Sequence, residues 1–134
     1  MSELLRPPPQ ASIDSLPYWQ GLRNHQLRLQ RCLGCARYRH YPRPLCPHCH
    51  CFEVEWVTVS GEAEVCSWTT LHHAFHPAFK ALTPCVVVTA TLREGVRLLA
   101  PFRGDSARLT RGLALRVGFE EISAELTLPM LLPA

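Results

Sequence analysis

Apolar and polar residues alternate in short runs through the second half of the chain, and turn residues separate these runs. A period of two is typical of strands, because successive side chains of a strand point to opposite faces of a sheet. The pattern predicts five strands, over residues 54–60, 64–71, 85–92, 96–102 and 113–120. Five short strands with one longer connection, residues 72–83, favour a five-stranded OB-fold barrel.

Two of the expected turns contain a glycine, the residue that most easily adopts a positive φ angle. Residues 93–95 (Arg-Glu-Gly) predict a hairpin loop, and residues 110–112 (Thr-Arg-Gly) predict a second turn. Residues 127–134 read as an apolar tail bounded by prolines, which we expect to pack on the barrel or on another chain.

The first third of the chain follows a different pattern. A short helix is expected after residue 15, with Asp14 or Ser15 as its N-cap and with Asn24 ending it in a left-handed conformation. Leu27 and Leu29 alternate with polar neighbours and predict a strand that leads to Cys32. The fold class is therefore mainly β, with a short N-terminal helix and ribbon before the barrel.

The same patterns suggest three parts. Residues 1–13 are rich in proline and predict a flexible arm. Residues 14–52 hold the helix and a metal ribbon, and residues 53–134 hold the barrel with its C-terminal tail. At 134 residues and 47% apolar content, the chain is long enough for one core and a small metal-held part.

The metal ribbon is predicted from four cysteines in two C-x2-C pairs that are ten residues apart: Cys32, Cys35, Cys46 and Cys49. Four thiolates at about 2.3 Å fill the tetrahedral shell of zinc and leave no position for water, so the site is expected to be structural. Disulfides or ordinary thiols are the alternative, but disulfide frameworks belong to secreted chains. Residues 1–12 carry three consecutive prolines where a secretory signal would be apolar, so we expect a reducing, cytoplasmic location.

Other side chains near the cysteine pairs are weaker candidates for metal ligands. Cys51 lies two residues after the second pair, and His48 and His50 flank it, but four thiolates already satisfy the metal. Cys66 and Cys85 lie in apolar runs and are expected to be small buried side chains.

Charge is distributed unevenly along the chain. The net charge is +3, but residues 1–52 carry seven arginines against two acids (+5), and residues 53–134 carry seven cations against nine acids (−2). The basic part suits phosphates of a nucleic acid or nucleotide cofactor, or an acidic protein surface, and a merely solvated face is the alternative. No apolar run approaches the roughly 20 residues that cross a bilayer, so no membrane association is expected.

Several phrases occur in a fixed order from about Pro17 to the end of the chain. They are LQRCLGC (29–35), YPRPLCPHC (41–49), WVTVSG (56–61), SWT (67–69), LREG (92–95), LTRGLALRV (109–117) and LPMLLPA (128–134). Together they resemble the family of acyl-CoA-associated OB-fold proteins with an N-terminal rubredoxin-like zinc ribbon. The chain departs from that family after Gly61, where members often have a second glycine, and at Cys66, where they often have an aromatic residue.

The resemblance implies a non-catalytic accessory subunit in lipid or steroid metabolism. Members of the family are partners of thiolase-superfamily enzymes, which include thiolases, acyltransferases and lipid-transfer-type aldolases, or are fused to acyl-CoA hydratases. The implied assembly is a hetero-oligomer with structural zinc. Whether a CoA thioester contacts this chain is left open, because both departures affect the expected ligand contact more than the fold.

The sequence contains no nucleophile elbow, phosphate loop or useful pair of carboxylates, so no catalytic residue is assigned. His72, His73 and His76 form one dense titratable group, whose role as a catalytic base, a channel lining or plain surface stays open. A free-standing acyl-CoA-binding protein or thioesterase is a further alternative, although it lacks a nucleophile and a base.

The main alternative is a single-stranded nucleic-acid-binding module, because ribbons and OB barrels both serve that role. The N-terminal arginines would contact phosphates, and Trp68 and Phe102 would stack on bases. Tyr18, Trp19 and Trp56 are better explained as packing residues, and aromatic residues make up only 8% of the chain. Nucleic acid is therefore not the expected partner.

Overall fold

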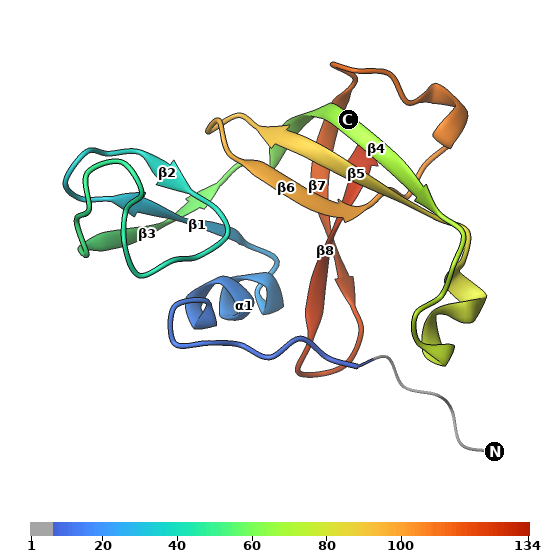
Figure 1. Cartoon of the computed structure of the whole chain (residues 1–134), viewed down its shortest axis with the longest axis horizontal. Helices are drawn as coiled ribbons and strands as arrows, with labels where there is room; N and C mark the ends of the chain where they lie inside the picture. Colours follow the sequence, from blue (N-terminus) through green and yellow to red (C-terminus); the bar gives the residue numbers. More distant parts are fainter. Residues whose placement is uncertain (1–6) are drawn as a thin grey trace.

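The computed structural model describes residues 7–134, in which two β-sheets follow one another along the chain (Figure 1). Helix α1 (Leu16–Arg23) precedes a three-stranded sheet in the order β2-β1-β3. Its strands are β1 (Leu27–Cys32), β2 (Tyr38–Arg39) and β3 (Val54–Val59). Residues 1–6 of the predicted arm lie outside the described residues, and residues 7–12 carry no helix or strand.

The second sheet has five antiparallel strands in the order β6-β5-β4-β7-β8. Its elements are β4 (Glu62–Leu71), β5 (Cys85–Leu92), β6 (Arg97–Pro101), β7 (Ala114–Glu121) and β8 (Thr127–Pro133), with 3-10 helices η1 (Pro77–Leu82) and η2 (Ser106–Arg108) in the connections. A parallel bridge between Phe102 and Leu131 joins the two outer strands, and the amide of Arg103 donates to Leu131 O at 2.9 Å. The sheet is thus closed into the predicted mainly β barrel.

Two strand assignments from the sequence were wrong. Residues 54–60 do form a strand, but β3 pairs with β1 of the ribbon sheet from Leu27–Val59 to Cys32–Val54 and is not a barrel strand. The fifth barrel strand is β8, which was expected to be a tail. The expected division at residue 53 stays a prediction, with β3 just beyond it.

Two prolines hid strand β8 from the sequence analysis, because proline cannot donate to a sheet. The amide of Ala134 donates to Ala114 O at 3.2 Å. Backbone groups alternate along a strand, so the even-numbered residues of β8 direct their N–H and C=O groups to β7 and the odd-numbered residues direct theirs away from it. Pro129 and Pro133 occupy positions that face away. Their missing N–H groups therefore remove no hydrogen bond from the β7–β8 ladder.

The ends of the short helix also differ in part from expectation. Ser15 is the N-cap residue, as one of the two options stated, but its side chain makes no capping hydrogen bond. Asn24 has a φ of −96°, and the left-handed conformation falls on His25, with a φ of 56°. Asn24 instead donates its side-chain amide to Gln20 O at 3.2 Å, so it satisfies a helix carbonyl without a left-handed backbone.

One buried cluster connects the two sheets. Tyr18 and Leu22 of α1 belong to the same core as Leu29 of β1 and Leu131 of β8, and the helix packs on both of these strands. Trp19 and Trp56 pack against this core, as predicted. The helix therefore fixes the ribbon against the barrel. None of the helices between residues 7 and 134 is long and apolar enough to span a membrane.

Candidate metal centre

The four cysteines of the two C-x2-C pairs meet at one end of the ribbon sheet. Their Sγ atoms all lie within 4.8 Å of one another. Cys32 Sγ is 3.4 Å from Cys49 Sγ, and Cys35 Sγ is 3.7 Å from Cys46 Sγ. Four sulfurs at 2.3 Å from one tetrahedral zinc would be about 3.8 Å apart, so the arrangement fits that ion.

Both cysteine pairs are held by the same backbone turn. The amide of Ala36 donates to Cys32 O at 2.9 Å, and the amide of His50 donates to Cys46 O at 3.0 Å. Ala36 and His50 have φ angles of 64° and 63°, the left-handed conformation that non-glycine residues seldom adopt. Two strained residues at equivalent positions suggest that the backbone is shaped to aim the sulfurs at a common point.

Backbone amides favour the thiolate form of two of these cysteines. The amide of Cys35, together with that of Gly34 at 3.3 Å from the sulfur, lowers the pKa of Cys32 to about 6. The amides of Cys49 and His48 likewise lower the pKa of Cys46. Thiolates are the form of cysteine that binds metal, so both shifts favour metal ligation.

Cys49 behaves differently because its sulfur lies among the others. The amide of Cys51 favours its thiolate, but the neighbouring sulfurs, first that of Cys32, and burial outweigh this amide and raise the pKa of Cys49 to about 12. Four sulfurs at this spacing therefore cannot all be thiolates without a cation among them. This is the charge pattern of a divalent metal site.

The other candidate ligands lie outside the cluster. His48 and His50 are exposed, and neither joins the group of mutually close ligand atoms among the described residues. Cys51 Sγ lies 3.8 Å from Glu53 O instead. Cys66 and Cys85 are half-buried, so the expectation that they are buried was met only in part.

A buried polar group supports the ribbon and was not predicted. Gln30 Oε1 accepts from Arg39 Nε at 3.0 Å and from the amide of Arg43 at 2.8 Å, and Arg39 Nη2 donates to Arg43 O at 3.0 Å. Arg39 is 6% exposed. Arg31 is also engaged, in an ion pair with Glu55 at 3.4 Å. The basic patch inferred from the sequence is therefore smaller than the arginine count indicates.

Aromatic rings fill the junction between ribbon and barrel. The ring of His40 lies 5.0 Å from that of Tyr18 and 4.2 Å from that of Tyr41, measured between centroids. Burial lowers the pKa of His40 to about 4 and, with a smaller contribution from Tyr41, raises that of Tyr18 above its usual range. His40 is thus an uncharged packing residue at neutral pH.

The three histidines of the connection between β4 and β5 lie in separate surroundings. His76 Nδ1 accepts from the amide of Ala78 at 3.0 Å and so caps η1. His73 packs edge-on against Phe75, and His72 is exposed. No carboxylate is placed against any of them by the ion pairs and hydrogen bonds of residues 7–134.

The two aromatic residues considered for base stacking differ in their exposure to solvent. Phe102 is 7% exposed and belongs to the core, whereas Trp68 is 42% exposed. One exposed tryptophan on the barrel does not form the stacking platform of a single-strand-binding OB fold.

A ribbon with a four-thiolate cluster, joined by a helix to a closed five-stranded barrel, defines the class of zinc-ribbon OB-fold proteins. Two family models match the chain in succession. Residues 19–55 match the rubredoxin-like zinc ribbon domain of ChsH2, and residues 56–120 match the ChsH2 C-terminal OB-fold domain. The chain belongs to the ChsH2 (DUF35) family, and the resemblance seen in the sequence is confirmed.

Solved structures with this fold include close and distant relatives. A structure described as "Ltp2-ChsH2(DUF35) aldolase" contains a chain 34% identical, with a TM-score of 0.84 over 94% of this chain and 98% of that one. A DUF35 protein of unknown function from Sulfolobus solfataricus is 18% identical, with a TM-score of 0.62 over 91% of this chain and 86% of that one. The second likeness shows the fold alone.

Two curated proteins are also similar to the chain. A probable enoyl-CoA hydratase alpha subunit of Thermomonospora curvata is 36% identical over 97% of this chain. A 3-oxo-4,17-pregnadiene-20-carboxyl-CoA hydratase alpha subunit of Mycobacterium tuberculosis is 35% identical over 83% of it. The chain spans only 40% and 35% of the length of these relatives.

Proposed function

We propose that this chain is a non-catalytic accessory subunit that binds and supports a thiolase-superfamily enzyme acting on acyl-CoA substrates. The observation that carries the proposal is the match to a chain of the Ltp2-ChsH2(DUF35) aldolase, with a TM-score of 0.84 over 98% of that chain. The name of that structure joins two components. A relative that matches over nearly its whole length supports the same kind of assembly here.

The proposed role of the metal centre is structural. Cys32, Cys35, Cys46 and Cys49 would hold one zinc ion, which when bound cross-links the two turns of the ribbon. The four sulfurs would fill its tetrahedral shell, and this argues against a water-activating site. The separate roles of His73 in packing and His76 in capping support the absence of catalysis by the barrel.

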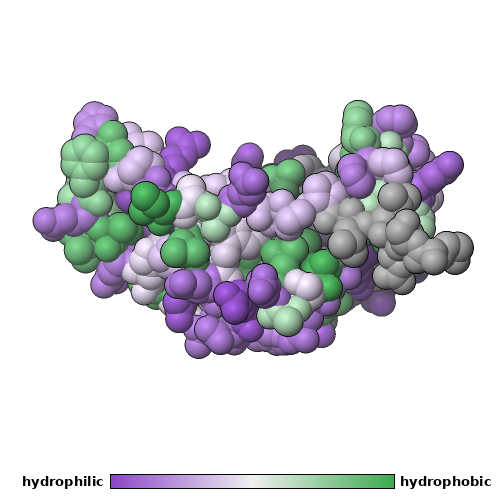
Figure 2. Space-filling view, turned by 90° about the horizontal axis from the view of Figure 1, so that it is seen from below, coloured by the Kyte–Doolittle hydropathy of each residue, from purple (hydrophilic) through white to green (hydrophobic). Residues whose placement is uncertain are grey.

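Exposed apolar side chains support a protein partner. Leu33 and Phe52, on the ribbon, are 55% and 74% exposed, and hydrophobic residues lie on the surface at that end of the molecule, on the left in Figure 2. Exposed apolar surface beside polar residues is typical of protein interfaces. A ribbon held rigid by metal would present such side chains at little entropic cost.

Co-purification tests the proposal. The tagged full-length chain, expressed in its own host, is expected to retain a thiolase-superfamily enzyme in a fixed ratio, and the isolated chain is expected to turn over no acyl-CoA thioester. A stable monomer without such a partner would contradict the proposal, as would thioester turnover by the chain alone. A salt titration with single-stranded DNA is the control, since tight and steeply salt-dependent binding would favour the nucleic-acid alternative.

A second candidate is the same supporting role in an acyl-CoA hydratase. Both curated relatives are named as hydratase alpha subunits, and the chain matches a part of each. The identity of the co-purified enzyme decides between the candidates, because a thiolase-type partner would form or cleave carbon–carbon bonds and a hydratase would add water. Equilibrium dialysis with CoA, for the chain alone and for the complex, tests whether CoA contacts this subunit.

A further inference from the structure

The outer end of strand β4 has a neighbour on one side only. β4 pairs with β5 over residues 63–71, but with β7 only over residues 62–64. A bulge between Val65 and Ser67 follows, and bulges bend a strand away from its former course. Residues 67–71 are therefore an open edge of the sheet, next to β5, which pairs with β6 on its other side; residues 67–71 and their partners 85–89 of β5 are called the arm below (Figure 1).

The register shows which backbone groups of this arm point outward. The amide of Phe102 donates to Val86 O at 2.9 Å, so Val86 faces β6. Backbone groups alternate along a strand, so the N–H and C=O groups of the next residue of β5 face β4. That residue pairs with Thr69. Trp68 and Thr70, on either side of Thr69, turn their N–H and C=O groups to the open side. Within residues 7–134 no hydrogen bond satisfies these groups.

This open edge lacks the usual protection against strand pairing. Sheet edges are normally blocked by charged side chains, prolines or covering elements. Residues 67–71 read Ser-Trp-Thr-Thr-Leu, without charge or proline, and all five are exposed. By contrast, the edge of β6 is covered where Tyr41 Oη accepts from the amide of Leu99 at 3.1 Å. The β4 edge is ready to pair with an extended polypeptide.

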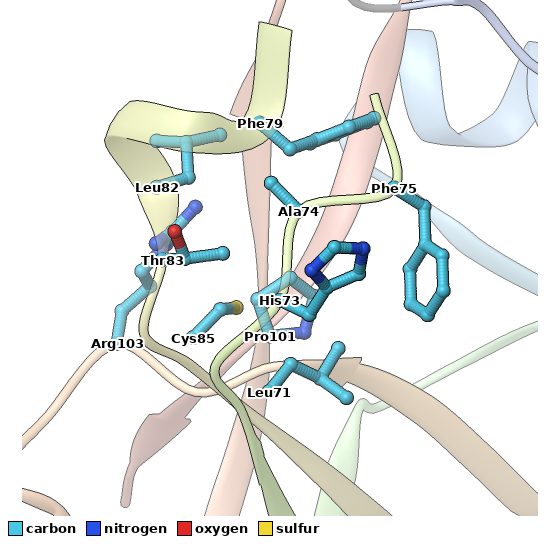
Figure 3. A pocket seen from close by; sticks show the side chains of 10 residues that line it. All are labelled: Leu71, His73, Ala74, Phe75, Phe79, Leu82, Thr83, Cys85, Pro101 and Arg103. Atoms are coloured by element: carbon cyan, nitrogen blue, oxygen red, sulfur yellow. The ribbon is translucent and has the colours of Figure 1, made fainter. Parts of the chain in front are cut away.

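A hollow next to the edge would hold a side chain of such a polypeptide. It has a volume of about 300 Å³, and its walls include Leu71, Phe79, Leu82 and Cys85 (Figure 3). Leu71 and Cys85 are directly paired across β4 and β5, so the hollow opens on the arm itself. Phe75, at its rim, is 88% exposed. An incoming strand alternates its side chains between two faces, and one face would meet this hollow.

Charge indicates what kind of segment would pair here. From Cys66 to Thr91 the chain carries Lys80 and three histidines but no aspartate or glutamate. A segment with apolar side chains and a flanking carboxylate would therefore complement the arm better than a basic segment. A second copy of the arm would oppose lysine and histidines with the same residues.

We propose that an extended, carboxylate-bearing segment of the partner enzyme subunit pairs with residues 67–71 of β4 as an added strand and places an apolar side chain in the hollow. The proposal deepens the proposed function and rests on it. Main-chain hydrogen bonds to Trp68 and Thr70 supply the pairing, and the hollow supplies selectivity.

Substitution of Thr70 tests the added strand. Thr70→Pro removes an outward N–H without breaking the β4–β5 ladder, and Thr110→Pro, at an exposed loop position, is the matched control. The probe is the enzyme subunit that co-purifies with the full-length chain. Its affinity is expected to fall by about tenfold or more with Thr70→Pro and to stay unchanged with Thr110→Pro. Thr70→Lys, paired with Thr110→Lys, gives a second comparison should the proline disturb folding.

Hydrogen exchange gives a direct readout on the same amides. Those of Trp68 and Thr70 are expected to exchange quickly in the free chain and at least about tenfold more slowly in the complex. If both Thr70 variants bind the enzyme subunit with full affinity, and the amides of Trp68 and Thr70 are unprotected in the wild-type complex, the added strand is overturned and the proposed function still stands. A wild-type chain that binds no enzyme subunit would overturn both. Protection in a homodimer of the isolated chain would assign the edge to a second copy, against the proposal.

Discussion

The backbone amide of Leu99 donates to the hydroxyl of Tyr41, with an N–O distance of 3.1 Å. Leu99 lies in the edge strand β6, and Tyr41 lies in the loop that follows β2 of the ribbon. A side chain of the metal-binding part thus satisfies a strand edge of the barrel. His25 Nε2, between α1 and β1, also contacts Glu121 Oε1 of β7 at 2.9 Å, so a second side-chain contact joins the two parts.

Tyr41→Phe is expected to destabilise the protein slightly. The substitution removes the acceptor, but the Leu99 residue is half exposed, so water can replace the hydroxyl and the loss in unfolding free energy should be about 0.5–1.5 kcal/mol. Urea unfolding measures it. Tyr38→Phe is the control, because no hydrogen bond of the Tyr38 hydroxyl occurs among the described residues. Equal losses for both variants would show that the Tyr41 hydrogen bond contributes nothing.

Cys32→Ser and Cys46→Ser are expected to abolish zinc binding. The wild-type chain should hold about one zinc, since four thiolates form one site, and structural zinc contributes directly to folding free energy. Each variant should lose the ribbon and keep the far-ultraviolet signal of the barrel. Metal content and circular dichroism measure this. Cys66→Ser, remote from the cluster, should keep the metal, and a zinc-free wild-type chain would overturn the assignment.

His40 is expected to make stability depend on pH below neutrality. Burial lowers its pKa from 6.5 to about 4. As the pH falls, His40 of the unfolded chain is therefore protonated at a higher pH than His40 of the folded chain. The unfolding free energy should therefore fall between pH 6.5 and 4, by up to about 1.4 kcal/mol per pH unit from this residue.

His40→Phe keeps an aromatic ring between Tyr18 and Tyr41 and removes the titrating group. The difference in unfolding free energy between wild type and variant should change across this pH range and be constant above it. Taking the difference cancels the effect of acid on the cysteine cluster. Parallel curves for wild type and His40→Phe would contradict the prediction.

Gln30→Leu is expected to cost about 1–3 kcal/mol of unfolding free energy. The leucine fills a similar volume but leaves buried Arg39 Nε without its side-chain acceptor, and unsatisfied buried donors are costly. Gln20→Leu, on the exposed face of α1, should change stability little. Denaturant unfolding compares the two. A neutral Gln30→Leu would mean that Arg43 O, 3.3 Å from Arg39 Nε, is a sufficient acceptor for that N–H group.

The sequence predicted most elements because their alternation is local. Strand pairing is not local, and this is why residues 54–60 were found as a strand but assigned to the wrong sheet. The cysteine spacing predicted a cluster that the folded backbone forms, since each pair needs only one turn to aim its sulfurs. The burial of Arg39 could not be predicted, because nothing beside it in the sequence distinguishes it from exposed Arg37.

Pro129 and Pro133 have a consequence beyond the barrel itself. Both face away from β7, so the outer border of β8, which the amide of Arg103 already contacts at Leu131, lacks an N–H donor at residues 129 and 133. A border of that kind is a poor template for fibril growth. An added strand is therefore expected to pair less readily with β8 than with the open edge of β4.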